Sequence, residues 1–251
     1  MATPPQHATY AWSASGTIGL SVREGDGDRG VCSEVIETDC YRLRHIRAQD
    51  ADIRTVLDLG ANMGAFSAHV HALYPYAQIE AHELLSENLG LLRHNVGSFA
   101  QVRHSCISTL PPEEVLVANS NLHGVYGGSY VFPDWQLPEL STDEYAPTPV
   151  TAEVVSFEAI MEGREEVDLV KMDIEGSEDA ILSASPSLRR ARWIVGEFHN
   201  IDHWIGVIDE VLPDHTKLIE RDPDMPTMGL FVMTSDGDLS GFPPVFPEAE
   251  G

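Results

Sequence analysis

The sequence predicts an α/β protein built on a doubly wound, mostly parallel sheet. From residue 54 onward, apolar strand-like segments alternate with segments whose apolar residues recur at helical spacing. This alternation is typical of parallel strands covered by helices on both faces. Two final strand-like segments are joined by a short connection, which only antiparallel neighbours allow. The sequence therefore also predicts an antiparallel hairpin at one edge of the sheet.

The first half of the core alternates three predicted strands with two predicted helices. The strands are expected at residues 54–59, 77–83 and 100–107. The helices between them are marked by apolar side chains that share one face, Phe66, Val70 and Leu73 in the first and Leu85, Leu89, Leu92 and Val96 in the second.

The strand–helix pattern resumes after residue 150. Further strands are expected at residues 150–155, 167–174, 191–199, 216–221 and 229–234. Helices are expected at residues 156–163, 177–185 and 201–212. The strand at 167–174 is unusual because charged residues interrupt its apolar run at every second position.

The chain divides into one core domain and three additions. Residues 51–234 form the core, and an insertion at about 107–150 contains one short strand candidate, 114–119, among Gly, Pro and aromatic residues. A loop of this length in a compact domain usually covers or binds something. We expect residues 1–50, which include an amphipathic segment at 41–50, to belong to a substrate cover. We expect residues 235–251 to form a flexible acidic tail.

The charge balance constrains the partners. The chain carries 40 acidic and 15 basic residues, a formal net charge of −25. This argues against nucleic acid and anionic membrane surfaces as partners, because both attract basic patches. No apolar run is long enough to span a membrane, and three cysteines without metal-ligand spacing favour a cytoplasmic location. Homo-oligomerisation stays open.

The stretch VLDLGANMGAFS, which follows the first strand, predicts a nucleoside site. Gly60 and Gly64 allow close approach of the backbone to a ligand, and Asp58 directly precedes the turn. Glu83 ends the second strand, where a carboxylate can accept hydrogen bonds from both hydroxyls of a ribose. Ligands of such sheets bind at these carboxyl ends.

The glycine spacing separates this site from a nicotinamide site. The dinucleotide fingerprint is G-x-G-x-x-G, but Asn62 and Ala65 occupy its second and third glycine positions here. The pattern favours a smaller, cationic nucleoside with its positive end near Asp58. S-adenosylmethionine is such a ligand.

Four segments together resemble the FkbM-type family of S-adenosylmethionine-dependent methyltransferases: VLDLGANMGAFS, IEAHELLSENLGLLRHNV, VDLVKMDIEGSEDAIL and WIVGEFH. The resemblance covers residues 53–233, and its most specific part is K-x-D-x-E-G-x-E at 171–178. It implies a Rossmann-like class I methyltransferase fold with a seven-stranded sheet. It also implies methyl transfer to a hydroxyl of a small molecule, often a specialised metabolite or a sugar. The residues expected to bind the cofactor are Asp58, Gly60, Ala61, Asn62, Gly64, Ser67, Glu83, Ser105 and Cys106, the last two near the adenine.

Polar residues at two neighbouring strand ends form the candidate catalytic site. Lys171 and Asp173 end one strand, while Glu197 and His199 end the next. In one chemistry, Asp173, Glu197 and His199 bind Mg²⁺ or another divalent cation that holds the acceptor hydroxyl. In the other, His199 or Asp173 is a general base and Lys171 neutralises the excess negative charge.

Other interpretations remain open at this stage. Lys171, Asp173 and Glu175 can form a network that only fixes the strand end, with Glu175 and Glu178 at the start of the following helix. The acceptor can be an amine instead of a hydroxyl, or the chain can bind S-adenosylmethionine without turnover. In the insertion, His123 and Tyr126 can reach an acceptor if this segment closes over the site.

Overall fold

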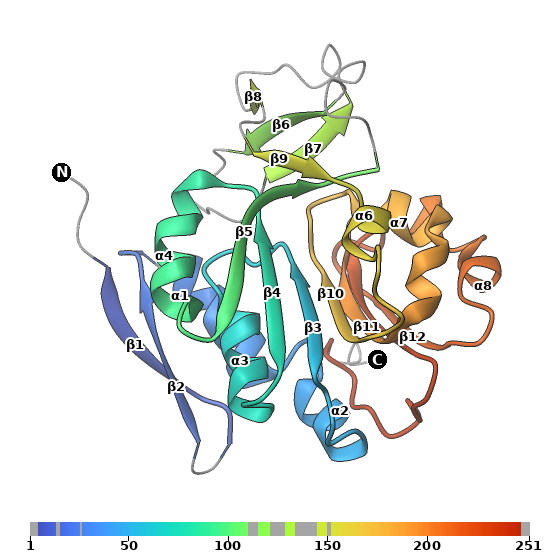
Figure 1. Ribbon diagram of the computed structural model, residues 1–251, viewed down its shortest axis with the longest axis horizontal. Helices are drawn as coiled ribbons and strands as arrows, with labels where there is room; N and C mark the ends of the chain where they lie inside the picture. The colour runs from blue at the N-terminus through green and yellow to red at the C-terminus, as the bar shows by residue number, and fades with distance from the viewer. Residues whose placement is uncertain are drawn as a thin grey trace.

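The computed structural model describes residues 5–13, 16–25, 27–109, 115–120, 129–133, 145–149 and 152–246. Its centre is an eight-stranded sheet with the order β12-β13-β11-β10-β3-β4-β5-β9 (Figure 1). The strands are β3 (Thr55–Leu59), β4 (Gln78–Glu83), β5 (Ala100–Ile107), β9 (Glu153–Val155), β10 (Val167–Met172), β11 (Ala191–Phe198), β12 (Thr216–Arg221) and β13 (Gly229–Thr234).

The sheet is parallel except at one strand. β13 runs antiparallel to both β11 and β12, which confirms the predicted hairpin of the last two strands. The chain leaves β3 toward β4 and β5 on one side, whereas β10 and β11 lie on the other side. This reversal makes the β3–β10 boundary the switch point, where ligands of such sheets bind. The predicted fold class is confirmed, and the eighth strand is β9, which pairs with β5.

Helices cover both faces of the sheet (Figure 1). On one face lie α3 (Ala65–Leu73) and α4 (Ser86–Val96). On the other face lie α6 (Phe157–Ile160), α7 (Glu178–Ala184) and α8 (Ile208–Val211). Because successive strand residues point to opposite faces, Val56 joins the core cluster of the first face and Leu57 that of the second.

The N-terminal extension belongs to the main core. A hairpin of β1 (Gln6–Ala11) and β2 (Thr17–Val22) leads to α1 (Gly27–Cys32), the π-helix η1 (Ser33–Thr38) and α2 (Leu43–Gln49). Val22, Ile36 and Leu43 are fully buried in the cluster that also contains α3 side chains. The amphipathic segment at 41–50 is confirmed as α2, whereas the pattern of residues 1–40 did not predict the hairpin.

One local prediction is wrong. Residues 201–212 form a 3₁₀ turn, η6 (Ile201–His203), and the single-turn α8 instead of one helix. Gly206 lies between them, and glycine is a weak helix former. Within the described part of the tail, Phe242 stacks on Trp193 with ring centroids 6.3 Å apart, and the Arg42 Nε–H donates to the Pro243 carbonyl.

The insertion contributes a small sheet of its own. Its order is β7-β6-β8, with antiparallel pairing of β6 (Val115–Ser120), β7 (Ser129–Pro133) and β8 (Tyr145–Pro149). It lies near β9, at the end of the molecule where β5 ends (Figure 1). β6 matches the predicted strand at 114–119. His123 and Tyr126 lie outside the described residues.

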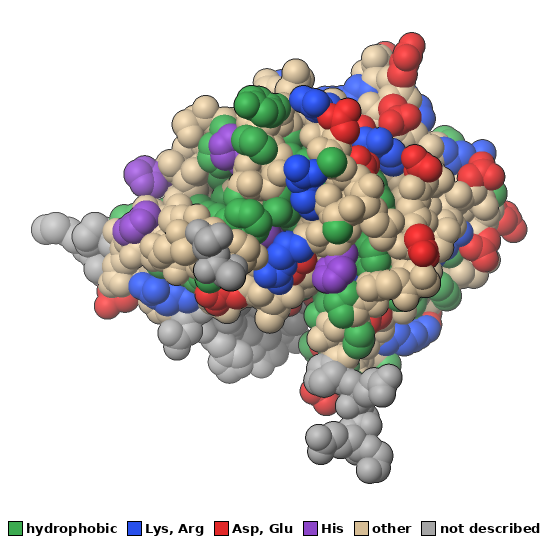
Figure 2. Space-filling view, turned by 90° about the horizontal axis from the view of Figure 1, so that it is seen from below, with side chains coloured by type: hydrophobic (Ala, Val, Ile, Leu, Met, Phe, Trp, Pro, Cys, Tyr) green, Lys and Arg blue, Asp and Glu red, His purple; other side chains and the backbone are tan. Residues whose placement is uncertain are grey.

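The opposite end of the molecule shows how surface charge is distributed. Seen from below, acidic and basic side chains are interspersed (Figure 2). At the amino ends of the strands, for example, Arg192 contacts Asp50 and Asp168. Among the residues described, no helix has both the length and the apolar character that crossing a membrane requires.

Candidate cofactor and acceptor site

The turn after β3 forms the floor of the site. Gly60 has φ +79°, and a Cβ on it would collide with the backbone carbonyl of Asp173. Asn62 also adopts a left-handed conformation, with φ 49°. Glycine at position 60 therefore lets the turn lie directly against the chain that leaves β10.

Glu83 is held in place by the backbone on both sides of it. Its Oε2 accepts the Asn62 N–H at 2.7 Å, and its Oε1 accepts the Leu85 N–H at 2.7 Å. The side chain is only 5% exposed. The Asn88 side-chain amide also donates to Oε1 at 3.3 Å, so Oε2 is the oxygen that keeps an acceptor site for a ribose hydroxyl.

Glu83 lines a first pocket of about 560 Å³. The predicted cofactor residues on its wall are Gly60, Asn62, Glu83, Ser105 and Cys106. The amide oxygen Oδ1 of Asn62 is buried without a hydrogen-bond partner in the described part of the chain. This orphan acceptor, beside a fixed carboxylate, fits a ligand that carries several N–H or O–H donors, as an adenosine does.

Three other predicted cofactor residues lie behind the pocket walls. Asp58 is fully buried and accepts a hydrogen bond from the Ser67 hydroxyl at 2.6 Å. Gly64, with φ +99°, packs against Val96 of α4. These positions support the loop that faces the ligand. Ala61 faces a different pocket, which adjoins the first.

The second pocket, of about 630 Å³, adjoins the first at the switch point. The two pockets share Gly60, Asn62, Asp173 and Glu175. The N-terminal extension contributes a further wall, with Val31, Glu34, Val35, Cys40 and Tyr41. Glu197 and Lys171 complete the polar lining. The two pockets therefore lie on either side of the same four residues.

Lys171 is the cation at the centre of this site. It is 3% exposed, and its Nζ lies 3.6 Å from Asp58 Oδ1 and 3.3 Å from Asp173 Oδ2. It also donates to the Gly60 carbonyl at 2.5 Å. Burial lowers the pKa of Lys171, but the charges of Asp173 and Asp58 raise it by more, so the pKa lies above its ordinary value. The Tyr41 hydroxyl donates to Asp173 at 3.0 Å.

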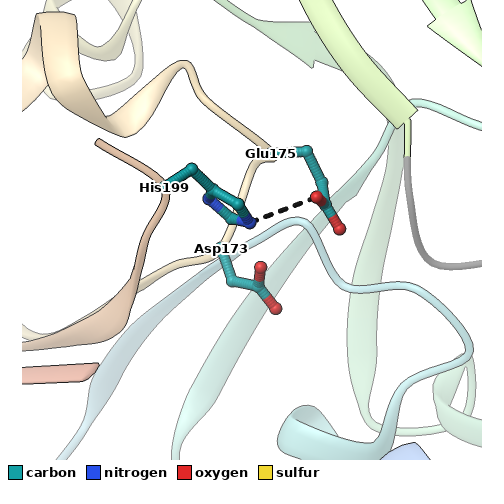
Figure 3. Close-up of side chains that lie close together, drawn as sticks. All are labelled: Asp173, Glu175 and His199. Atoms are coloured by element: carbon teal, nitrogen blue, oxygen red, sulfur yellow. Dashed lines mark ion pairs between the residues drawn. The ribbon is translucent and has the colours of Figure 1, made fainter. Parts of the chain in front are cut away.

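His199 contacts the carboxylates of Glu175 and Glu178, and Figure 3 shows the contact with Glu175. Its Nε2 is 3.2 Å from Glu175 Oε2, and its Nδ1 contacts the fully buried Glu178. Glu178 also accepts the Gly176 N–H at 2.8 Å. Asp173, Glu175 and His199 offer ligand atoms that all lie within 4.8 Å of one another.

This grouping differs in one member from the ligand set expected from the sequence. The predicted metal ligands were Asp173, Glu197 and His199, but the third member of the described cluster is Glu175. Glu175 follows β10 with φ 53°, so strand alternation does not predict where its side chain points. The sequence did contain one indication of the role of Glu175: it lies three residues before Glu178, at the start of α7.

The protonation of these groups separates candidate bases from fixed charges. Burial lowers the pKa of His199, but its contacts with Glu175 and Glu178 outweigh this and raise it to about 12. A ring that is already protonated cannot accept a proton. Although burial raises the pKa of Asp173, Lys171 and His199 lower it below its ordinary value. Burial and the charge of Asp173 raise the pKa of Glu197 to about 8, which suits a general base.

These shifts predict that stability falls as the pH rises from about 5 to 8. Burial chiefly raises the pKa of Asp179 to about 6 and of Glu175 to about 7, and Glu197 reaches about 8. In this range the folded state keeps protons that the unfolded chain has already lost. Each such group therefore lowers the free energy of unfolding by about 1.4 kcal/mol for every pH unit. His199 stabilises the folded state fully below pH 6.5, and this stabilisation is lost as the pH rises toward 12. His199 therefore also makes stability fall with rising pH.

Thermal unfolding between pH 5 and 8 measures this slope. Glu197→Gln should flatten it, whereas Glu210→Gln, at an exposed position of α8, should leave it unchanged. A melting temperature that rises with pH in both the parent and Glu197→Gln would contradict the expectation.

Comparison with known proteins agrees with this geometry. The family model described as "Methyltransferase FkbM domain" matches residues 46–220, more than half of the chain. A relative, 31-O-demethyl-FK506 methyltransferase FkbM of Streptomyces tacrolimicus, is 26% identical over 222 residues, which cover 76% of this chain and 82% of that protein.

Solved structures of similar shape include several methyltransferases. Precorrin-6y C5,15-methyltransferase from Geobacter metallireducens has a TM-score of 0.42 and 15% identity, with 79% of this chain and 87% of that chain covered. An O-methyltransferase from Bacillus cereus in complex with SAH has a TM-score of 0.39 and 13% identity, with coverage of 78% and 79%. On the match of the family model, this chain belongs to the FkbM family of S-adenosylmethionine-dependent methyltransferases.

Proposed function

We propose that this enzyme methylates a hydroxyl group of a small molecule with S-adenosylmethionine. The observation that carries the proposal is the shared wall of the two pockets, formed by Gly60, Asn62, Asp173 and Glu175. Adenosine would lie in the first pocket with its ribose on Glu83, and the acceptor would lie in the second. The name of the Streptomyces relative, which specifies a 31-O position, supports oxygen over nitrogen as the acceptor atom.

The residues of the second pocket suit this chemistry. When bound, S-adenosylmethionine supplies an electrophilic methyl group on a positively charged sulfur. Asp173 and Glu175 provide negative charge beside it, and Lys171 with Tyr41 fixes the position of Asp173. Glu197, on the wall of the second pocket, would accept the proton of the acceptor hydroxyl, and the pocket would position the acceptor oxygen for attack on the methyl group.

A divalent cation such as Mg²⁺ is a second way to activate the hydroxyl. Asp173, Glu175 and His199 present two carboxylates and an imidazole within ligand distance of one another. In this arrangement Glu178 would orient His199 through Nδ1, as carboxylates do for ligating histidines. The proton on His199 would have to leave first, which makes metal binding pH-dependent. Glu197, the ligand predicted from the sequence, would then remain the base.

Calorimetric titration with S-adenosylhomocysteine, followed by turnover with hydroxylated acceptors, tests the proposal. We expect binding of the nucleoside and methylation of a neutral small-molecule acceptor. We expect Glu197→Gln to lower kcat about 100-fold with little change in nucleoside affinity. Absence of nucleoside binding would overturn the function, and unchanged kcat in Glu197→Gln would overturn the role of Glu197.

The same assays separate the remaining candidates. Turnover abolished by EDTA and restored by Mg²⁺ identifies the metal route. Methylation of an amine that does not depend on Glu197 identifies an N-methyltransferase. Binding without any turnover identifies a non-catalytic protein. We further propose a cytoplasmic role in specialised metabolism, which the three free, buried cysteines support.

A further inference from the structure

The wall of the second pocket carries more acidic than basic side chains. In the described part of the chain, four carboxylates line it: Glu34, Asp173, Glu175 and Glu197. Lys171 is the one cationic side chain on the same described lining. Its charge is already matched, because its Nζ lies 3.3 Å from Asp173 and 3.6 Å from Asp58, which is buried behind the wall. The lining therefore offers no cation to offset the other three carboxylates.

Two of these three carboxylates also lack hydrogen bonds. Glu175 contacts His199 at 3.2 Å, which offsets its charge. The side chains of Glu34 and Glu197, by contrast, accept no hydrogen bond from any described residue. Glu197 has a pKa of about 8 and is largely protonated at neutral pH, whereas Glu34 is solvent-exposed, and an exposed carboxyl is ionised there. Glu34 is therefore the main uncompensated charge of the wall.

The negative charge of the wall affects the groups around it. Besides burial, the charge of Asp173 raises the pKa of both Glu34 and Tyr41. Burial, and then the charge of Glu34, raise the pKa of Cys40, which also lines the pocket. In each case the surroundings oppose a further negative charge. They would oppose a negative charge on a ligand for the same reason.

Much of the remaining wall is apolar, with Val31, Val35 and Phe66 among its members. Such a surface suits the uncharged body of an acceptor. Proteins bind phosphate and carboxylate groups with arginine and lysine side chains, and the described lining holds none that is unpaired. The π-helix η1 carries Glu34 to the solvent-exposed part of this wall, so Glu34 is placed to meet an acceptor that enters.

We propose that Glu34 makes the second pocket reject acceptors with a negatively charged group, so that the hydroxyl compound arrives without a phosphate or a carboxylate. This rests on the proposed function, because it concerns the pocket that would hold the acceptor. A precursor with such a group must first lose its charge, either by hydrolysis of the phosphate ester with water or by condensation of the carboxylate with an alcohol or an amine. Glu34 is a specificity-determining residue and takes no part in the methyl transfer itself.

Charged thiol reagents measure the field at this wall without a known acceptor. Val31 is half-buried on the pocket wall, and Val31→Cys places a thiol there. The variant is treated with 2-aminoethyl methanethiosulfonate, a cation, or 2-sulfonatoethyl methanethiosulfonate, an anion, and tandem mass spectrometry follows the labelling. We expect the ratio of cation to anion rates to exceed that of free 2-mercaptoethanol about tenfold. The parent chain, whose own cysteines are buried, gives the background rate.

Two substitutions in the Val31→Cys background separate Glu34 from the other charges. Glu34→Gln should lower the rate ratio about threefold or more. Glu37→Gln removes an exposed carboxylate of the same π-helix that does not line the pocket, and it should keep the ratio. A ratio equal to that of the free thiol, or one that Glu34→Gln leaves unchanged, would overturn the proposal and leave the methyltransferase function intact.

Turnover tests the selection itself with acceptors that differ by one charged group. Catechol is compared with 3,4-dihydroxybenzoate, and glucose with glucose 6-phosphate. In a pair that is methylated, the parent should use the neutral member with a kcat/KM at least about tenfold higher, and Glu34→Gln should narrow this difference, mainly through the KM of the charged member. Faster methylation of the charged member by the parent would overturn the proposal. Failure of S-adenosylhomocysteine to bind would overturn the proposed function, while the labelling ratio would still report the charge of the wall.

Discussion

Lys171→Met is expected to lower the free energy of unfolding by about 3–5 kcal/mol. Lys171 is the cation in contact with both Asp58, which is fully buried, and Asp173. The variant would leave two carboxylates without their counter-charge in a site of low polarity, and this is more costly than never having buried them. Urea unfolding measures the loss. It is a large share of the 5–15 kcal/mol typical of a folded domain.

A second lysine provides the control. Lys217 contacts Asp209, which is 87% exposed, and donates to the Leu212 and His215 carbonyls, but it neutralises no buried carboxylate, so Lys217→Met should cost only about 1–2 kcal/mol. Adding Asp58→Asn to Lys171→Met should recover part of the loss, because it removes one of the stranded charges. If Lys171→Met unfolded at the same urea concentration as the parent, Lys171 would not be the group that stabilises these carboxylates.

Glu83→Ala is expected to weaken binding of S-adenosylhomocysteine about 100-fold or more. A hydrogen bond from a ribose hydroxyl to a carboxylate, worth about 1.5–3 kcal/mol, would be lost. The Asn62 and Leu85 amides that Glu83 accepts would lose their partner too, so the turn around the pocket would loosen. Calorimetry at constant pH and salt measures the change.

Glu87→Ala is the matched control, because Glu87 is an exposed acidic residue four positions further along the chain. It should bind the nucleoside like the parent. If Glu83→Ala and the parent bound the nucleoside equally tightly, the ribose would not contact Glu83. Unfolding curves of both variants are needed as well, since a general loss of stability would lower affinity without any specific contact.

The core strands were predictable because each carries its own local pattern. The strand predicted at 100–107 is observed with the same bounds as β5, and the bounds of β12 and β13 also agree with the prediction. Glu83 was found for the same reason: it ends a strand whose alternation fixes the side of the sheet. Buried strands constrain nearly every residue along their length, so a short window contains the information.

The missing parts depend on contacts between distant residues. The bond from Arg42 to the Pro243 carbonyl, which holds the tail, joins positions 201 residues apart and leaves no local pattern. The π-helix η1 carries Glu34 into the second pocket through a geometry that periodicity does not anticipate. Glu175 was expected at the start of the following helix, yet its left-handed backbone turns its side chain toward His199.

The N-terminal wall of the second pocket bears on whether members of the family share one acceptor preference. Val31, Glu34 and Tyr41 line that pocket, yet the segment that defines family membership begins at residue 46. The turn at 60–64, where we propose that the nucleoside binds, and the polar ends of β10 and β11 lie inside that segment. Membership therefore carries information about the methyl donor but little about the molecule that receives the methyl group. If residues 31–41 are exchanged between two family members, each variant should acquire the acceptor preference of the protein that supplied the segment.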